Sequence, residues 1–504
     1  MQMNNFKQRI SAFVHSRNFF SGVLVAVVIA AVVFLNIIVY TLDAYFGLYI
    51  YNKPEEDLSI GDASDALFAE AMAAGEKVTV TFCMYEDDVK THTTGSYVYR
   101  TAKEFEARYP EFIELRYVSV ITRLDSEGEH FDTSKYEKDM RGMDTVINET
   151  TVIFESGDNY RVLTDVATAA GYVDFYTLDD EMYITSYNGE EVFAAMSSWV
   201  LSDEHGTAYF TVGHSETPNL SLYNVLACAG YYVDTVNLRR EELPEDASLV
   251  VVCNPLTDFE RAAEGSSIKT EIERLTKFMN DGGSMLVTLD PQAKRLTVFE
   301  KFLADFGIEV MRTDSGESNI VKDTENGITT DGFTLVCDYA GSDVSAQMSE
   351  KISAEDGRIV IRSVAALKLS GDAQPLLVSS SAAVCQAAGE TVDRSGSYTV
   401  AACSSRENED GSTARIVVVP SVYLTATDAI VTNGYSNKDF LYSLFDVFYG
   451  HGSMPYGCRS VVYESYVLEN LTIGEARLYT ALLIAIPVIL AGVGVFVTVR
   501  RRNR

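Results

Sequence analysis

Polar side chains follow several apolar runs of this sequence, where short strands are expected to end. They are His214, Ser215 and Glu216 after 207–212, Asn254 after 249–253, Asp290 after 285–289 and Ser421 after 416–419. A histidine beside a glutamate can act as a general base oriented by its carboxylate partner. These residues are therefore candidates for a small-ligand, hydrolytic or interaction site. The competing interpretation, which we favour, is that His214 and Glu216 bind their own loop and cap the helix that follows.

The motifs that usually accompany such chemistry are missing from the sequence. No G-x-S-x-G or G-x-C-x-G turn supplies a nucleophile. No G-x-x-x-x-G-K-[ST] or helix-opening G-x-G-x-x-G supplies a phosphate loop. Runs of carboxylates at 55–57, 86–88 and 179–181 lack the spacing of a calcium loop. We therefore expect no catalytic residue, no cofactor, no metal and no enzymatic activity.

The elements that must position the candidate residues alternate between strand and helix. Apolar runs at 207–212, 232–238, 249–253 and 285–289 are separated by helical spacing at 222–229 and 268–279. Strands alternating with helices predict a doubly wound parallel sheet, like that of flavodoxin or a class I amidotransferase, over 203–450. Residues 312–370 read as a β-rich insertion. Runs at 376–379 and 416–419 are expected to return to the sheet across a polar link at 387–410, before a one-sided helix at 439–449.

A smaller α/β unit is predicted at 76–202. A strand at 78–85, a helix at 97–109, a strand at 113–120, a hairpin at 151–163 and a helix at 189–201 give a thioredoxin-like outline. The first strand ends in Cys83-Met84-Tyr85-Glu86, without the second cysteine that dithiol chemistry needs. The seven cysteines show no metal-binding spacing, and several lie in apolar runs, so buried thiols are expected.

The ends of the chain carry hydrophobic segments. Residues 19–42 and 478–499 contain no charged side chain, and a helix of that length spans a bilayer. A cleaved signal peptide is the alternative for 19–42, but the apolar run is long and no A-x-A site follows. Basic residues flank the ends at 1–18 and 500–504, which places both termini in the cytoplasm. All 72 acidic residues lie between, in the predicted extracytoplasmic part, with stalks at 43–75 and 451–477.

Several segments together resemble a family of auxiliary components of ABC-type transport systems named for gliding motility (GldG-like). They are GHSE (213–216), GYYVDTVNL (230–238), LPEDASLVVVCNPLTDF (243–259), FMNDGGSMLVTLDP (278–291), ARIVVVPSVYL (414–424) and NGYSNKDFLYSLFDVF (433–448). The family more often has Gly-His-Gly-Glu where this chain has Ser215, and an acidic residue where it has Pro420-Ser421. The resemblance covers about 77–448 and implies a non-ATPase subunit beside a permease and its cytoplasmic ATPase.

Two functions from different classes remain. The favoured one is a membrane-anchored, bacterial ABC transporter auxiliary subunit whose acidic outer domain is an interaction or substrate-presenting scaffold. The alternative is a stand-alone extracytoplasmic ligand-binding protein or degenerate hydrolase that uses the loop at 213–216. A formal net charge of −32 argues against a nucleic-acid partner for either.

Overall fold

A computed structural model describes residues 58–462 and six single positions beyond them, with gaps at 93, 165–174, 179–183, 204, 261–269, 353–356, 394–395, 433, 451, 453 and 459. Two α/β units make up this part of the chain, here called the first unit (58–202) and the second unit (205–450). Among the described residues, no helix has the length and apolar character needed to cross a bilayer. The predicted span at 19–42, and the one at 478–499 apart from isolated residues, lie outside the described part.

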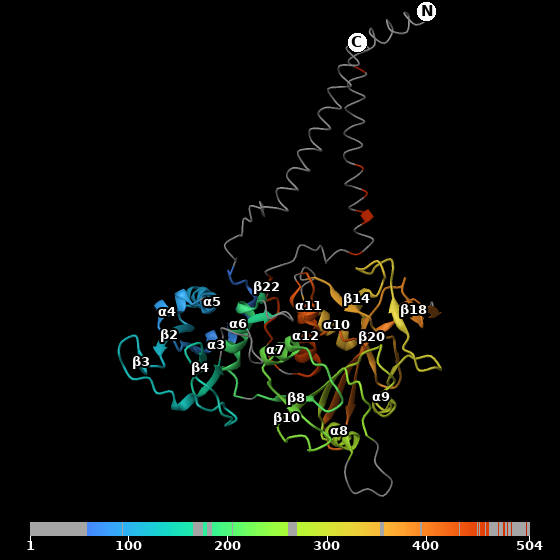
Figure 1. Ribbon diagram of the computed structural model, residues 1–504, viewed down its shortest axis with the longest axis horizontal. Coiled ribbons are helices and arrows are strands. Elements are labelled where there is room, and N and C mark those ends of the chain that lie inside the picture. The colour runs from blue at the N-terminus through green and yellow to red at the C-terminus, as the bar shows by residue number, and fades with distance from the viewer. Residues whose placement is uncertain are drawn as a thin grey trace, which may run out of the picture. The chain divides into compact units, whose positions relative to one another are not determined.

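The first unit is a five-stranded sheet in the order β3-β2-β1-β4-β5 with helices packed against it (Figure 1). Strand β1 is parallel to β2 and antiparallel to β4, and β4 forms a hairpin with β5. This connectivity agrees with the predicted strand–helix–strand–hairpin–helix outline. Its elements are α3 (Ala63–Ala74), β1 (Val78–Phe82), α4 (Glu86–Thr91), α5 (Gly95–Arg108), β2 (Ile113–Ser119), β3 (Leu124–Asp125), η1 (Ser134–Tyr136), β4 (Val152–Ser156), β5 (Asn159–Leu163), β6 (Tyr176–Leu178), β7 (Ile184–Tyr187) and α6 (Gly189–Trp199).

The second unit is built on a mixed sheet whose path runs β15-β14-β17-β20-β21-β11-β10-β8-β9. Its elements are β8 (Thr207–Thr211), α7 (Leu220–Cys228), β9 (Tyr232–Val236), β10 (Ala247–Cys253), α8 (Glu271–Asn280), β11 (Ser284–Thr288), α9 (Thr297–Ala304), β12 (Ile308–Val310), β13 (Ile320–Lys322), β14 (Thr334–Tyr339), α10 (Asp343–Glu350), β15 (Ile359–Arg362), β16 (Leu367–Leu369), β17 (Gln374–Val378), β18 (Val384–Ala387), β19 (Glu390–Asp393), β20 (Thr399–Glu407), β21 (Thr413–Val419), α11 (Thr427–Val431), α12 (Asn437–Ser443) and η2 (Leu444–Phe448). A short strand, β22 (Val461–Val462), pairs with β7 of the first unit.

The five strands from β9 to β21 are parallel to their neighbours, and taken in chain order they have the arrangement 2-1-3-4-5. That arrangement is a doubly wound one, with a reversal between β8 and β10. The predicted parallel sheet is therefore confirmed over these strands. Beyond β21 the sheet continues antiparallel through β20, β17, β14 and β15.

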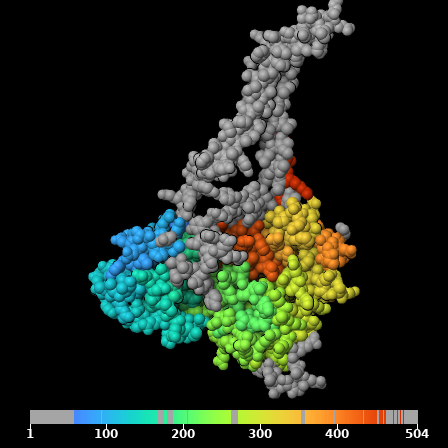
Figure 2. Space-filling model, in the orientation of Figure 1, coloured from blue at the N-terminus to red at the C-terminus, as the bar shows by residue number. Residues whose placement is uncertain are grey.

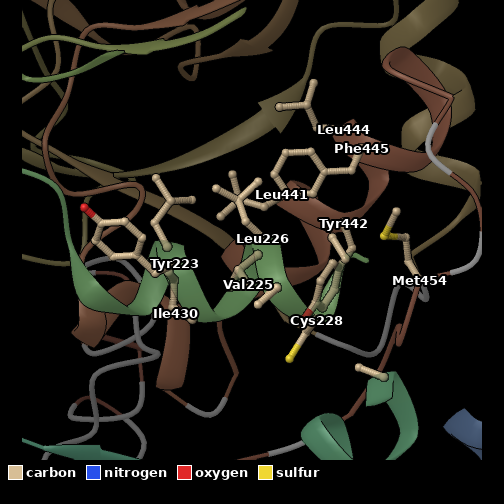
Figure 3. Close-up of a cluster of buried hydrophobic side chains, with 14 of the residues drawn as sticks. Tyr223, Val225, Leu226, Cys228, Ile430, Leu441, Tyr442, Leu444, Phe445 and Met454 are labelled. Carbon is tan, nitrogen blue, oxygen red and sulfur yellow. The ribbon is translucent and has the colours of Figure 1, made fainter. Parts of the chain in front are cut away.

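Helices cover both faces of the parallel strands, which explains why β10 at the middle of the sheet is continuously apolar from Leu249 to Cys253. Leu222 and Leu226 of α7 belong to one buried cluster with Val251 of β10. Leu275 of α8 and Val250 of β10 belong to the cluster on the opposite face. Figure 3 shows side chains of α7 meeting those of α12 and η2 in the first of these clusters.

Local sequence sets the ends of the helix that precedes β11. Thr270 and Glu273 form a reciprocal capping box at the start of α8. The helix ends before Gly282, whose φ of +87° lies in the left-handed region. A Cβ at this position would lie 2.7 Å from the Cβ of Ser412, so glycine also permits the approach of the β20–β21 loop.

Both predicted stalks are shorter than expected. In the segment predicted as the first stalk, Phe68 of α3 is fully buried and packs edge-on against Tyr109 and at 4.9 Å from Phe112. In the segment predicted as the second, Met454 and Cys458 are buried. The described ends of both segments therefore belong to the folded body, because they supply apolar side chains to its core.

The link at 387–410 was predicted to be polar, and this is wrong for its second half. Strand β20 lies between β17 and β21, and its residues Ala401, Ala402 and Cys403 are buried. Small side chains give little hydrophobic signal in a sequence, although they allow close packing at the middle of a sheet. The insertion at 312–370 is also less separate than expected, since β14 and β15 extend the main sheet and α10 is a helix.

The helix predicted at 439–449 is observed as α12 followed by η2, and its first part, α12, is buried on every side rather than on one. All seven residues of α12 are buried, including Lys438 and Asp439. Lys438 Nζ lies 2.9 Å from Glu191 Oε2 on α6 of the first unit, and the Tyr442 hydroxyl donates to the same carboxylate. In the space-filling view, the cyan surface of the first unit adjoins the green surface of the second (Figure 2), consistent with this contact.

Candidate functional site

The candidate residues lie at the carboxyl edge of the parallel strands, where the chain order of the sheet reverses. Loop 212–219 follows β8 and loop 254–260 follows β10, and these two strands are neighbours. Their following helices, α7 and α8, pack on opposite faces of the sheet. Doubly wound proteins bind ligands in the crevice that opens between two such loops. We call this place the switch point.

Backbone hydrogen bonds join the two loops at the switch point. The amides of Leu256 and Thr257 both donate to the carbonyl of His214, at 2.9 and 3.1 Å. The amide of Thr217 donates to the carbonyl of Cys253 at 3.2 Å. These bonds hold together the two segments that would have to part for a crevice to open. The switch point is therefore closed by main-chain contacts.

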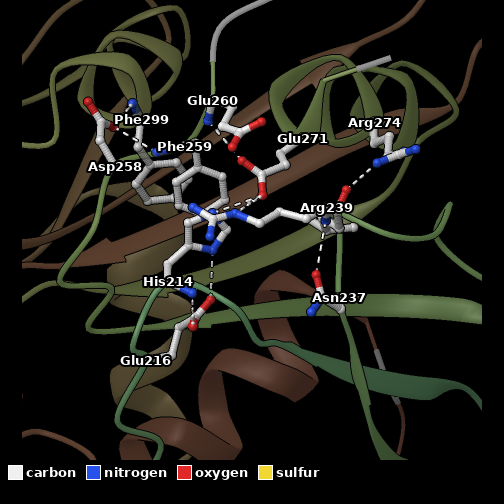
Figure 4. Close-up of polar contacts among 11 residues, drawn as sticks. His214, Glu216, Asn237, Arg239, Asp258, Phe259, Glu260, Glu271, Arg274 and Phe299 are labelled. Carbon is white, nitrogen blue, oxygen red and sulfur yellow. Dashed lines mark hydrogen bonds and ion pairs between the residues drawn. The ribbon is translucent and has the colours of Figure 1, made fainter. Parts of the chain in front are cut away.

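His214 is the centre of a buried charge network (Figure 4), here called the histidine network. Its side chain is 0% exposed. Nδ1 lies 3.0 Å from Glu216 Oε1, and Nε2 lies 3.0 Å from Glu271 Oε1. The backbone amide of His214 also donates to Glu216 Oε2 at 2.6 Å. The imidazole is thus held between two carboxylates, and neither ring nitrogen faces solvent.

Two further groups complete the histidine network. Arg239 Nε lies 3.1 Å from Glu271 Oε1, and the amide of Glu260 donates to Glu271 Oε2 at 2.8 Å. The ring of Phe259 stacks on the imidazole with centroids 4.0 Å apart and planes 10° apart. With His214 protonated, two cations face two carboxylates, so the cluster is electrically balanced.

The pKa shifts agree with this charge balance. Burial disfavours the charged form of His214, but the bond to Glu216 and the negative charges of Glu271 and Glu216 outweigh it and raise the pKa of His214 above 6.5. Burial also disfavours ionised Glu216, but bonds from His214 and from backbone amides hold its pKa below 4.5. An imidazolium that is buried and paired on both sides is a poor general base, because it has no lone pair to offer and no path to a substrate.

The remaining candidate residues take other roles. Ser215 is exposed and has a φ of +56°. Asn254 is buried with a φ of +50°, and its Nδ2 lies 3.5 Å from the carbonyl of Thr217. Asp290 accepts a bond from the amide of Gln292 in its own loop, and Ser421 donates to the carbonyl of Arg362. The structure thus brings His214 and Glu216 together. Asp290 is bonded within its own loop, and Ser421 is bonded to the backbone of β15, so neither joins them.

Sequence reasoning missed Glu271, Arg239 and Phe259. Arg239 follows β9, so the rule that selected residues after β8, β10 and β11 would have included it. Glu271 is the first residue of α8, beside the capping box of Thr270, and a carboxylate is favoured at a helix start in any case. The carboxylate of Glu271 could therefore be explained by its position at a helix start alone. Nothing in the sequence shows that it also lies 3.0 Å from His214.

The cysteine thiols, which are the other potentially reactive side chains, are also buried. All seven cysteines are buried, as predicted. Burial raises the pKa of Cys83, Cys253, Cys385 and Cys403 to about 12, which disfavours the nucleophilic thiolate. Within the described ranges, no group of three or more His, Cys, Asp or Glu side chains is arranged to hold a metal ion.

Neither a protein-family model nor a curated protein matches this chain. Several solved structures align with about half of it. The mmIFT52 N-terminal domain is 16% identical over 49% of this chain and 99% of its own, with a TM-score of 0.37. A putative ThuA-like protein from Bacteroides uniformis is 10% identical over 48% and 91%, with a TM-score of 0.31. A glutamine amidotransferase from Thermotoga maritima is 12% identical over 51% and 89%, with a TM-score of 0.26. We draw no conclusion about activity from these distant likenesses, and the mixed α/β class rests on the strand order itself.

Proposed function

We propose that this protein is a membrane-anchored, non-ATPase auxiliary subunit of an ABC-type transport system, with its α/β units outside the membrane as an interaction scaffold. The resemblance of segments between 77 and 448 to the GldG-like family motivates the proposal. The observation that carries its non-enzymatic part is the position of His214, which is 0% exposed between Glu216 and Glu271. The place that an enzyme of this topology would use for chemistry is occupied by internal contacts.

Exposed apolar side chains on the same edge of the sheet support a scaffold role. Leu220 follows the β8 loop and is 74% exposed, Leu256 follows β10 and is 46% exposed, and Val422 follows β21 and is 39% exposed. Burying apolar surface against a partner stabilises a complex by roughly 25 cal/mol per Å². These three residues are the part of the carboxyl edge through which we expect a permease or its substrate to be contacted.

The proposal is tested by isolating the tagged full-length protein from native membranes and identifying what accompanies it. We expect a multi-span permease and its ATPase. Leu220→Asp should reduce their recovery at least tenfold, because a carboxylate cannot be buried unpaired in an apolar contact. Ile121→Asp is the matched control, since Ile121 is 72% exposed and lies on the loop after β2 of the first unit. A membrane complex that contains neither permease nor ATPase would contradict the proposal.

One observation favours the alternative, a stand-alone ligand-binding protein or degenerate hydrolase. Asn254 Oδ1 is buried and has no hydrogen-bond partner among the described residues, and its loop is bonded to the loop that contains the exposed Ser215. Both residues have a positive φ, and such conformations cluster at functional sites. Ser215→Ala distinguishes the two functions. If the Ser215→Ala variant loses its function in cells while its membrane complex stays intact, a ligand site at 213–216 is supported. If its function in cells is unchanged, the scaffold is supported.

A further inference from the structure

Two arginines contact one tyrosine ring where the two α/β units meet. Arg161 lies on β5 of the first unit, and its Cζ is 4.7 Å from the ring centroid of Tyr232, the first residue of β9 in the second unit. The Cζ of Arg141, in the loop before β4, is 4.0 Å from the same centroid. Arg161 also lies 5.0 Å from the ring of Trp199 on α6. We call these four residues the arginine cluster.

The positive charge of the arginine cluster is not balanced by carboxylates. Arg141 pairs with Asp139 Oδ2 at 3.1 Å. No carboxylate within the described part of the chain forms an ion pair with Arg161. Two guanidinium groups therefore share one carboxylate, in a chain that has 72 acidic and 40 basic residues. A half-buried cation without a counter-charge is unfavourable, so this arrangement calls for a ligand that supplies one.

The aromatic rings orient the guanidinium groups without using their donors. Trp199 and Tyr232 are buried at 3% and 4% exposure, whereas Arg161 is half-buried and the Arg141 side chain is 26% exposed. A guanidinium stacks through its face and donates hydrogen bonds in its plane. Arg141 already donates from Nε and Nη2 to Asp139 Oδ2, so the in-plane N–H groups that remain for a bidentate contact with a planar or tetrahedral oxyanion are chiefly those of Arg161.

Burial acts against the charge of Arg161 in the unliganded protein. Burial lowers the pKa of the Arg161 guanidinium, and the nearby charge of Arg141 lowers it further, while Tyr232 and Asp139 raise it. A bound anion would act in the same direction as Asp139, by offsetting both burial and the repulsion between the two arginines.

We propose that Arg161 and Arg141 bind an oxyanion, a phosphate or carboxylate group, at the junction of the two units. Both arginines belong to the first unit, and Tyr232 of the second unit contacts them through its ring, so the bound anion would lie beside the contact between the two units. This site is separate from the switch point and does not depend on the proposed transport function. Its ligand is identified by its chemistry as a small molecule that carries a phosphate or carboxylate group.

Trp199 makes the proposal directly testable, because it is the only tryptophan in the chain. The full-length protein is titrated with inorganic phosphate, and separately with acetate, at an ionic strength held constant with sodium chloride. We expect a saturable change in Trp199 emission. A response to phosphate alone assigns the site to phosphate groups, and a response to acetate alone assigns it to carboxylates; either result supports the proposal.

Arg161→Gln should weaken the saturable response at least tenfold, because it removes the unpaired cation. Arg116→Gln is the matched control, since Arg116 also lies on a strand of the first unit and above an aromatic ring, but pairs with Asp125 at 3.1 Å. A response that is linear and equal in all variants, or one that saturates equally in Arg161→Gln, would overturn the proposal. If circular dichroism shows that Arg161→Gln does not fold, Arg161→Lys and Arg141→Gln replace it, and unchanged binding in both has the same meaning.

Discussion

The histidine network and the arginine cluster differ in how their charges are balanced. In the histidine network, two carboxylates lie within 3.1 Å of two cationic groups, and every charged group has an opposite partner. In the arginine cluster, two guanidinium groups share the single carboxylate of Asp139. Charges that are already paired leave no partner for a ligand, whereas an unbalanced cluster can bind a counter-ion. The topology of the sheet leads one to expect a ligand at the switch point. The unbalanced charge that could bind a ligand lies instead in the arginine cluster.

The largest expected effect comes from removing a carboxylate from the balanced network. Glu271→Gln leaves His214 and Arg239 facing each other with one carboxylate fewer, and should lower the free energy of unfolding by about 3–5 kcal/mol. Urea unfolding followed by circular dichroism measures it. Glu273→Gln, two residues along the same helix at the exposed capping box, is the control and should cost no more than about 1 kcal/mol. Equal effects of the two substitutions would show that the network carries no special stability.

A smaller effect is expected from pH. Because the pKa of His214 is raised in the folded protein, its contribution is fully present below the unfolded value of 6.5 and is lost as pH rises through the folded pKa. His214→Gln should remove this part of the pH dependence, which unfolding curves between about pH 6 and 9 measure. Identical pH profiles for the native protein and the variant would mean that His214 is not held protonated by its partners.

The smallest effect is expected in the arginine cluster. In the absence of added anion, Arg161→Met should change the free energy of unfolding by less than about 1 kcal/mol, because the lost cation–π contacts are offset by removal of an unpaired charge. Arg312→Met provides the contrast. Arg312 is 8% exposed and pairs with Glu300 at 2.8 Å, so its loss should cost about 3–5 kcal/mol. A large cost for Arg161→Met would mean that Arg161 is balanced within the chain.

Much of the second unit could be predicted from the sequence because its strands are buried on both faces. The run at 249–253 is apolar without interruption, and the run at 285–289 contains only Thr288 as a polar member; they are β10 and β11 at the middle of the parallel sheet. Strand β20 could not be predicted in the same way, since four of its five buried positions hold the small side chains of Ala401, Ala402, Cys403 and Ser404. A helix was predicted at 439–449, where α12 and η2 lie, but not that Lys438 and Tyr442 of α12 would meet Glu191 of the first unit.

The candidate site was predicted in part. Its position at the carboxyl edge follows from a polar loop that comes directly after a predicted strand. The pairing of His214 with Glu216 follows from their separation of only two residues in the chain. The closure of the switch point does not, because it depends on bonds from Leu256 and Thr257 to His214, more than 40 residues earlier. Glu271 and Arg239 reach the imidazole from two further elements, and a single sequence contains no sign of that meeting.

The sequence by itself determined the α/β class, the doubly wound parallel sheet and the absence of nucleophile and phosphate loops, since these depend on local pattern and on residues close together in the chain. Only the tertiary structure decided that His214 is sealed between two carboxylates and that Arg161 meets Arg141 on Tyr232. The physical reason is that charge balance is set by distances of a few ångströms between residues far apart in sequence. A carboxylate next to a histidine in the chain can be read directly, but a missing counter-charge is visible only once the chain is folded.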